Sequence, residues 1–156
     1  MRFRPMQLGD IDAVVGIENI VSPVPWPTNQ FLDSIQNHHS KVLEYSSGIF
    51  GYAIYSYQSD QAELLNIAIE PKSQGSGWGR RLLRLVIEGL PVEVKKLFLD
   101  VRVSNFRAIR LYHSFRFEQI GEREGYYRTS NEAMRENALI MCCDVSDSRQ
   151  IQNAVF

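Results

Sequence analysis

A Gly-rich segment at residues 74–79 constrains the fold of this chain more than any other feature of its sequence. The preceding residues 62–69 are rich in β-forming side chains, and the apolar residues after the segment recur at the three- and four-residue spacing of an amphipathic helix. Those apolar residues are Leu82, Leu83, Val86, Ile87 and Leu90. The sequence therefore predicts a strand, a tight turn and a helix in direct succession.

This turn is suited to binding a phosphate or a pyrophosphate. N–H groups at the start of a helix have no partner inside the helix, and the helix dipole places its positive end there. Glycine lets the backbone approach a ligand without a Cβ clash, and Arg80 can add a charge-assisted hydrogen bond. The turn is not a P-loop, because no Gly-Lys-Ser/Thr ends it, and it lacks the Gly-x-Gly-x-x-Gly layout of dinucleotide-binding turns. A tight glycine turn without a ligand remains the alternative.

The rest of the chain also alternates between helical and β patterns. Asp10 can cap a helix that the Pro-rich residues 22–27 end, and Thr28 can cap a second, short helix. Residues 104–105 open another helix that ends near Ser114. β patterns occur at residues 41–45, 49–57, 62–69, 97–103, 117–121 and 137–145. The sum predicts an α/β domain with a mixed sheet, in which an antiparallel meander precedes a β-α-β unit.

Composition limits the classes of function. The 156 residues are enough for about one domain, so we expect a single domain over residues 1–156. Lys and Arg number 17 and Asp and Glu 18, and this net charge of -1 gives no global attraction to nucleic acid or to an anionic membrane. We expect no signal peptide or membrane span, and the adjacent Cys142 and Cys143 form neither a disulfide framework nor a Cys-x-x-Cys site. A reducing cytoplasm therefore fits best, and the scattered histidines predict no metal site.

The order of the motifs resembles the Gcn5-related N-acetyltransferase (GNAT) superfamily over nearly the whole chain. The motifs are, in order, Gln74-x-x-Gly77-x-Gly79 between a strand and a helix, Asp100-Val101-Arg102-x-x-Asn105 at the end of a strand, and Tyr112 on the next helix. Four segments are also similar to the bacterial ribosomal-protein-alanine N-acetyltransferases, the RimI group: residues 65–71, 99–105, 108–112 and 125–127. The resemblance implies a largely antiparallel central sheet of about seven strands, flanked by about four helices.

The resemblance implies acetyl-CoA as the co-substrate, with its pyrophosphate bound by the Gly-rich turn. The turn residues implied are Gly75, Ser76, Gly77, Trp78, Gly79 and Arg80. Ile67, Ala68 and Ile69 would pair with pantetheine, whose amides behave like an added β-strand. One of their N–H groups would polarise the thioester carbonyl, and Asn105 would contact the CoA arm. No metal is needed.

The resemblance also implies a general base and a general acid. Asp100 stands where the RimI group normally has Glu, and because Asp is one methylene shorter, we expect it to act through a bridging water. Tyr112 matches the tyrosine that protonates the departing CoA thiolate. Alternatively, Asp100 is a structural carboxylate, solvent-facing or paired with Arg102, and Glu63 is the reserve base. No cysteine stands in a matched motif, so we expect direct attack in a ternary complex rather than a covalent intermediate.

For the acceptor, the resemblance implies a protein α-amino group, the N-terminal alanine of small-subunit ribosomal protein S18. Trp26 in the Pro-rich loop, with Tyr126 and Tyr127 in a late loop, would line the acceptor groove, and packing roles for them are the alternative. Two other functions stay open: acetylation of a small amine or a lysine side chain, and acyl-CoA binding without catalysis. No nucleic-acid or membrane partner is expected.

Three positions depart from the family pattern. Arg116 stands where the superfamily commonly has a helix-ending glycine with positive φ, and a bulky residue there costs about 1 kcal/mol. Arg128 stands where the RimI group tends to have proline, and Gly75 and Ser76 replace longer polar residues. These departures bear on the choice of acceptor more than on the fold or the co-substrate.

Overall fold

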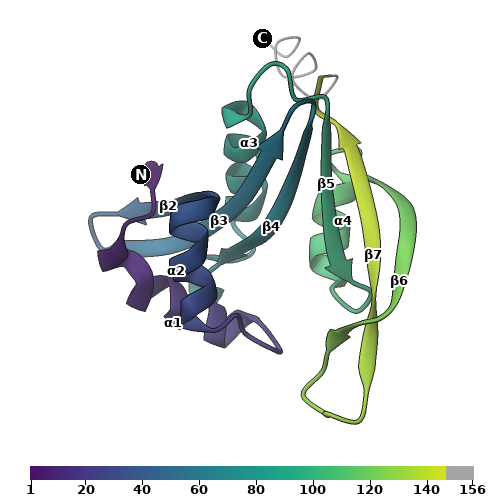
Figure 1. Cartoon of the computed structure of the whole chain (residues 1–156). Helices are drawn as coiled ribbons and strands as arrows, with labels where there is room; N and C mark the ends of the chain where they lie inside the picture. The colour runs from purple at the N-terminus through teal and green to yellow at the C-terminus, as the bar shows by residue number, and fades with distance from the viewer. Residues whose placement is uncertain (147–156) are drawn as a thin grey trace. The chain divides into compact units, whose positions relative to one another are not determined.

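The computed structural model describes residues 1–146, which contain seven strands in one sheet and four α-helices (Figure 1). The strands are β1 (Arg2–Pro5), β2 (His39–Tyr45), β3 (Gly48–Gln58), β4 (Gln61–Ile69), β5 (Lys96–Arg102), β6 (Glu118–Arg128) and β7 (Arg135–Asp144). The helices are α1 (Ile11–Val21), α2 (Thr28–Asn37), α3 (Trp78–Gly89) and α4 (Phe106–His113), with short 3-10 helices η1 (Leu8–Asp10) and η2 (Pro71–Ser73). The predicted α/β class with a mixed sheet is confirmed.

The strand order is β1-β2-β3-β4-β5-β7-β6. The β4–β5 pair is parallel, whereas the β1–β2, β2–β3, β5–β7 and β6–β7 pairs are antiparallel. The sequence does not predict β1, which has only four residues including a proline. It also ends β6 at residue 121, whereas the strand continues to Arg128. The prediction of a late loop for Tyr126 and Tyr127 is therefore wrong, because both residues lie within β6.

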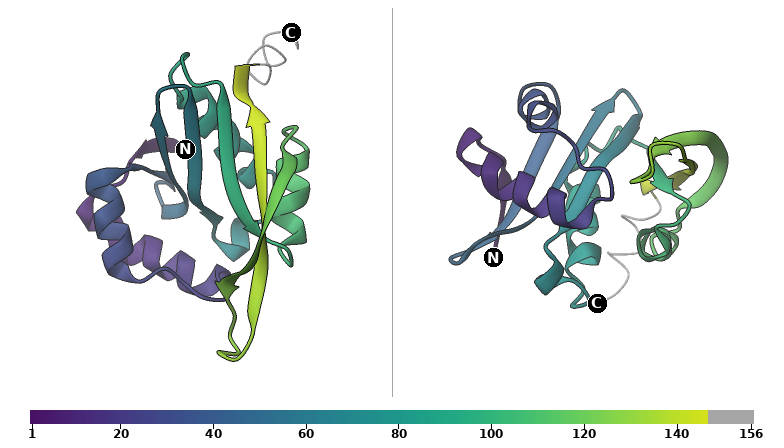
Figure 2. Two further views of the ribbon diagram at one scale, coloured as in Figure 1. Left: turned by 45° about the vertical axis from the view of Figure 1, so that its right-hand side comes forward. Right: turned by 90° about the horizontal axis from the view of Figure 1, so that it is seen from below.

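The chain divides into two compact units, and the first comprises residues 1–56 and 65–86. Within it, α1 and α2 lie on one face of the strands and α3 lies on the other (Figures 1 and 2). The core of α1, α2 and the facing strands consists of Met6, Ile11, Val14, Ile17, Phe31, Val42, Tyr52, Ile54 and Ala68. On α3, the predicted apolar residues Leu82, Leu83 and Val86 are fully buried. Burial of these apolar faces, worth roughly 25 cal/mol per Å², holds the helices on the strands.

The second unit comprises residues 57–64 and the chain from residue 87 onward. Its strand β5 alternates as predicted: Leu97, Leu99 and Val101 are buried, whereas Asp100 and Arg102 on the opposite face are partly exposed. The alternation continues across the sheet, because Leu99 lies opposite Met141 of β7 and Asp100 lies opposite Ile140. One face of β5 therefore belongs to the hydrophobic core, and the other presents charged side chains.

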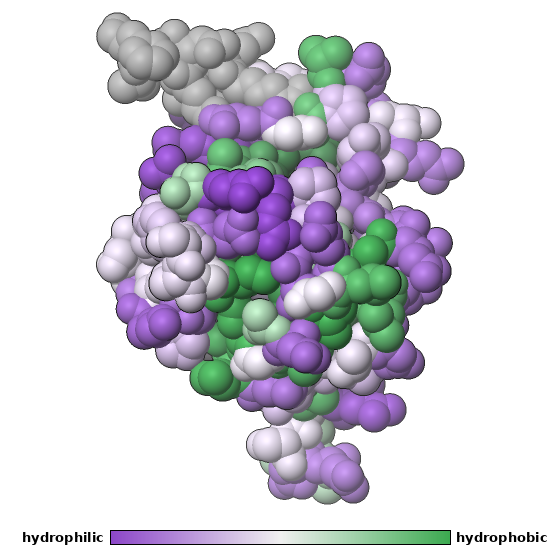
Figure 3. Space-filling view, turned by 90° about the vertical axis from the view of Figure 1, so that its left-hand side faces the viewer, coloured by the Kyte–Doolittle hydropathy of each residue, from purple (hydrophilic) through white to green (hydrophobic). Residues whose placement is uncertain are grey.

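Large apolar side chains are exposed on both units. Ile20 of α1 is 70% exposed and Phe106 of α4 is 72% exposed. On the face drawn in Figure 3, hydrophobic side chains gather around the middle, with hydrophilic side chains above and beside them. A hydrophobic area alone does not show which ligand binds there. No helix within residues 1–146 is long and apolar enough to cross a membrane.

Candidate functional site

The Gly-rich turn of the first unit has the conformation that its sequence predicts. Gly75 has φ +79 and Gly77 has φ +85, in the left-handed region that favours glycine. A Cβ at Gly77 would meet no atom within 4 Å, so the backbone angle, not crowding, requires the glycine. The Arg81 N–H donates to the Gly77 carbonyl at 3.0 Å, which closes the first turn of α3. The turn thus leads directly into a helix N-terminus, where N–H groups have no partner inside the helix.

Trp78 anchors this turn through its side chain. Its ring lies 5.1 Å from that of Phe50 and 5.6 Å from that of Tyr45, and the Arg81 guanidinium lies 5.5 Å from its centroid. Phe50 reaches it from a β-bulge, since Leu43 pairs with Gly51 and Glu44 pairs with Ile49. The indole of Trp78 therefore packs on the β2–β3 hairpin.

The last residues of β4 lie beyond the parallel pairing with β5. That pairing joins Gln61–Leu64 to Lys96–Leu99, and within the described chain residues 65–69 have no register partner in β5. The Gln74 side chain donates to the Ile69 carbonyl at 2.8 Å and so connects the strand end to the turn. The predicted pairing of Ile67, Ala68 and Ile69 with pantetheine needs main-chain groups of this segment that can accept an added strand.

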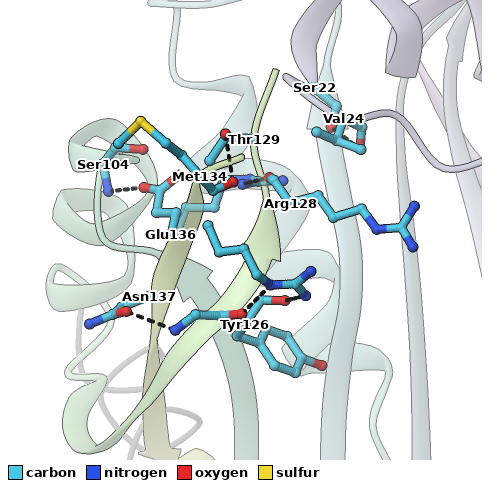
Figure 4. A network of polar contacts seen from close by, with 12 residues as sticks. Ser22, Val24, Ser104, Tyr126, Arg128, Thr129, Met134, Glu136 and Asn137 are labelled. Atoms are coloured by element: carbon cyan, nitrogen blue, oxygen red, sulfur yellow. Dashed lines mark hydrogen bonds and ion pairs between the residues drawn. The ribbon is translucent and has the colours of Figure 1, made fainter. Parts of the chain in front are cut away.

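Trp26 is held at the end of the Pro-rich loop by both its backbone and its ring. Its N–H donates to Oε1 of Glu18 at 3.0 Å, and its ring lies 5.5 Å from that of Phe31. Earlier in the loop, the Ser22 hydroxyl donates to the Val24 carbonyl at 3.0 Å (Figure 4). The loop between α1 and α2 is consequently fixed at both ends.

In the second unit, the carboxylate of Asp100 pairs with Arg123 of β6 at 3.3 Å. Its partner is therefore not Arg102, the alternative that the strand pattern suggests. Arg102 instead pairs with Glu136 at 3.3 Å and donates to the Arg128 carbonyl at 2.7 Å. The Asp100 side chain is 16% exposed, so it remains accessible to a water molecule or a small ligand atom.

Tyr126 and Tyr127 lie at a bulge of β6. Arg123 faces Ala138 and Tyr127 faces Glu136, so β6 takes four steps along its length where β7 takes two. Gly125 in the bulge has φ +55, and the aromatic rings of Tyr126 and Tyr127 lie 5.0 Å apart in an edge-to-face arrangement. The bulge turns the two tyrosines so that the Tyr126 side chain is 47% exposed while Tyr127 is partly buried.

Side chains of β7 hold this bulge in place. The Gly125 N–H donates to Oδ1 of Asn137 at 2.9 Å, and Arg135 donates to the Gly125 carbonyl at 2.6 Å and to the Tyr126 carbonyl at 3.1 Å (Figure 4). In the adjacent part of the network, the Ser104 N–H donates to Glu136 at 2.8 Å. The backbone of the bulge is thus satisfied by side chains where the ladder of the two strands is interrupted.

Tyr112 is fixed by the way α4 ends. The Phe117 N–H donates to the Tyr112 carbonyl and the Arg116 N–H donates to the His113 carbonyl, which is the hydrogen-bond pattern of a Schellman motif. Arg116 has φ +63, which confirms that it occupies the position of the helix-ending glycine. The Phe117 ring lies 5.5 Å from that of Tyr112, the hydrophobic contact that accompanies such a motif. Only 6% of Tyr112 is exposed.

Electrostatic interactions link three of the predicted site residues of the second unit. Burial raises the pKa of Tyr127 to about 12, and the charge of Asp100 adds to this effect. Burial also raises the pKa of Tyr112, and Tyr127 contributes in the same direction. Both hydroxyl groups are therefore protonated at neutral pH.

Two other predicted residues have defined places in the second unit. Oδ1 of Asn105 accepts from the Ala108 N–H at 3.2 Å and so caps α4. Glu63, the reserve base, is exposed on β4 where that strand pairs with β5. Within residues 1–146, no group of three or more His, Cys, Asp or Glu side chains is placed to hold a metal ion.

The family model described as the acetyltransferase (GNAT) family matches residues 11–117. The chain belongs to the GNAT acetyltransferases. It is 34% identical over 143 residues to the [ribosomal protein bS18]-alanine N-acetyltransferase of Escherichia coli strain K12, covering 90% of this chain and 95% of that protein. The resemblance to the RimI group is therefore confirmed.

Solved GNAT structures have the same fold. The crystal structure of the ribosomal-protein-S18-alanine N-acetyltransferase from Escherichia coli superimposes with a TM-score of 0.84 at 32% identity, over 92% of this chain and 93% of that one. Arabidopsis thaliana NAA60 in complex with acetyl-CoA has a TM-score of 0.79 at 16% identity, over 93% of this chain and 98% of that one. The second likeness concerns the fold alone.

Sequence reasoning missed two residues that contact predicted site residues in the structure. Arg123 is the ion-pair partner of Asp100, and Glu18 is a buried carboxylate that holds the Trp26 loop. No motif marks either residue. Glu18 has a weak signal, because its acidic side chain directly follows Ile17, a buried residue of the apolar face of α1.

Proposed function

We propose that this GNAT chain transfers the acetyl group of acetyl-CoA to the N-terminal alanine of ribosomal protein bS18, in the cytoplasm and as a single domain over residues 1–156. The observation that carries the proposal is the 34% identity to the Escherichia coli enzyme of that name, which extends over 90% of this chain. The left-handed glycines before α3 support the acyl-donor part.

On the donor side, the N–H groups of the turn from Gly75 to Arg80 bind the pyrophosphate. Residues 67–69 of β4 pair with the pantetheine arm, and one of their N–H groups polarises the thioester carbonyl. Asn105 caps α4 with its Oδ1, which leaves its Nδ2 group to donate to the CoA arm. The positive end of α3 favours the phosphate charge at the turn.

In the reaction, a neutral α-amine attacks the thioester carbonyl, so that a C–N bond forms and the C–S bond breaks. An α-amino group has a pKa of about 7.7–8.0, so roughly a tenth of it is already neutral at pH 7 and the base has little work to do. Asp100 accepts the amine proton through a water molecule. Tyr112, whose raised pKa keeps it protonated, donates its proton to the departing sulfur.

The acceptor is tested by comparing three substrates: a peptide that begins with alanine as bS18 does, a lysine peptide with a blocked N-terminus, and a free polyamine. We expect CoA release with the alanine peptide only. Preference for either of the other two would overturn the acceptor. Acetyl-CoA binding by calorimetry without CoA release from any substrate would indicate a non-catalytic domain, and absence of binding heat would reject the donor site.

A further inference from the structure

A buried carboxylate in the first unit has no role in the mechanism above. Glu18 of α1 is 3% exposed, and both of its oxygens accept hydrogen bonds. Oε1 accepts from the Trp26 N–H at 3.0 Å, and Oε2 accepts from the Tyr52 hydroxyl on β3. Burying a carboxylate costs free energy unless partners replace its water, so this side chain needs an explanation.

A comparison with Asp10, the other buried carboxylate of this unit, shows what is unusual about Glu18. Asp10 is compensated by a cation, because both of its oxygens accept from the Arg4 guanidinium at 2.7 and 2.9 Å. No such ion pair to Glu18 is present in residues 1–146, where its two partners are neutral. The buried Glu18 carboxylate is therefore not expected to stabilise the fold much, and we look for its role in the local geometry.

The geometry concerned is that of the Pro-rich loop. Pro23, Pro25 and Pro27 have no N–H, so Val24 and Trp26 carry the only N–H groups between residues 23 and 27, and that of Trp26 goes to Glu18. The prolines restrict the conformation of the loop, but they do not determine where the loop lies on the rest of the unit. Ring contacts also join the loop to β3. The Trp26 ring lies 5.5 Å from that of Phe31, which lies 5.6 Å from that of Tyr52.

The same contact reaches β4. The Tyr52 hydroxyl also hydrogen-bonds to Asn66, which directly precedes the strand edge assigned to pantetheine. We infer that Glu18 is a positioning residue that sets the place of the Trp26 loop relative to β3 and β4 through its bonds to Trp26 and Tyr52. The inference rests on the proposed function, because it takes this loop to be the acceptor wall.

The first test compares acetyl-transfer kinetics of Glu18→Ala, Glu18→Gln and the control Asp10→Asn. We expect Glu18→Ala to raise the KM for the alanine peptide about tenfold or more, with kcat changed less than about threefold and the affinity for acetyl-CoA unchanged. Glu18→Gln keeps an oxygen for the Trp26 N–H and stays within about threefold of the wild-type KM. An equal rise of the KM in Asp10→Asn, which removes a buried charge elsewhere, would overturn the inference.

The second test measures hydrogen exchange of the Trp26 N–H by NMR, which does not depend on activity. We expect exchange to accelerate about tenfold or more in Glu18→Ala. If that variant does not fold, Tyr52→Phe removes one of the two bonds to Glu18 and is expected to raise the acceptor KM about threefold.

Unchanged exchange in Glu18→Ala, or an unchanged acceptor KM in a folded variant, overturns the positioning role. If wild type ignores the alanine peptide, the proposed function fails, and the KM is measured with whichever acceptor the substrate panel identifies.

Discussion

The two units build their parts of the candidate site from different material. In the first unit, the Gly-rich turn depends on backbone: two left-handed glycines and a helix N-terminus. In the second unit, the candidate residues Asp100, Tyr127 and Tyr112 contribute side chains, and burial raises the pKa of both tyrosines. In the first unit, a substitution should therefore impair the site by straining the backbone dihedral angle φ. In the second unit, it should impair the site by removing a functional group.

The largest effect is expected for Tyr112→Phe, which tests the side-chain part of this comparison. It keeps the ring against Phe117 and removes the proton donor. We expect turnover to fall roughly 10²- to 10⁴-fold with stability and acetyl-CoA affinity preserved. Single-turnover kinetics and calorimetry measure both quantities, and wild-type turnover would reject Tyr112 as the general acid.

The backbone part is tested by the pair Gly77→Ala and Gly16→Ala. A Cβ at either glycine would meet nothing within 4 Å, and only Gly77 has a positive φ. We expect Gly77→Ala to weaken acetyl-CoA binding roughly 5- to 30-fold, from a left-handed strain of about 1–2 kcal/mol. Gly16→Ala, inside α1, should leave affinity unchanged and stabilise the fold by about 0.5–1 kcal/mol. Equal loss of affinity in both variants would show that φ is not the cause.

A third prediction concerns pH and the carboxylates of the first unit. Hydrogen bonds from Arg4 hold the pKa of Asp10 below its ordinary value, against the opposing effect of burial. A lowered folded-state pKa means that this stabilisation is present above the unfolded pKa of about 3.9 and is lost as the pH falls through the folded value. Asp10→Asn should cost about 1–3 kcal/mol at pH 7 and make the acid loss of stability shallower. Urea unfolding at pH 7 and pH 3 measures the free energy of unfolding of wild type and Asp10→Asn. An equal loss of this free energy in both proteins between the two pH values would contradict the prediction.

The smallest effect tests a backbone-determined feature of the second unit. Arg116 has φ +63, so Arg116→Gly should relieve strain of about 1 kcal/mol. For a chain of this size that raises the melting temperature by about 2–4 °C. Calorimetric melting checks the change, with Arg128→Gly as a control, since Arg128 lies in β6 and has no positive φ. A fall in melting temperature for Arg116→Gly would indicate that the arginine side chain stabilises the helix end.

Features that depend on local sequence were predictable. The left-handed glycines, the alternation along β5 and the strained Arg116 each follow from a short segment and its neighbours. Features that depend on how the strands pair with one another could not be predicted from the sequence. Arg123 reaches Asp100 only because β6 continues past residue 121, through a charged stretch with low β propensity. Glu18 was missed for a different reason, since its partners come from a loop and a distant strand.

The bulge in β6 has a consequence for how acceptor preference can change. Its backbone is held by Arg135 and Asn137, which belong to the neighbouring strand and not to the tyrosines themselves. Replacing either residue would re-aim Tyr126 without altering the aromatic rings. With Tyr126 in its proposed place in the acceptor groove, substitutions at these two positions on β7 would change the choice of acceptor and leave Asp100 and Tyr112 in place.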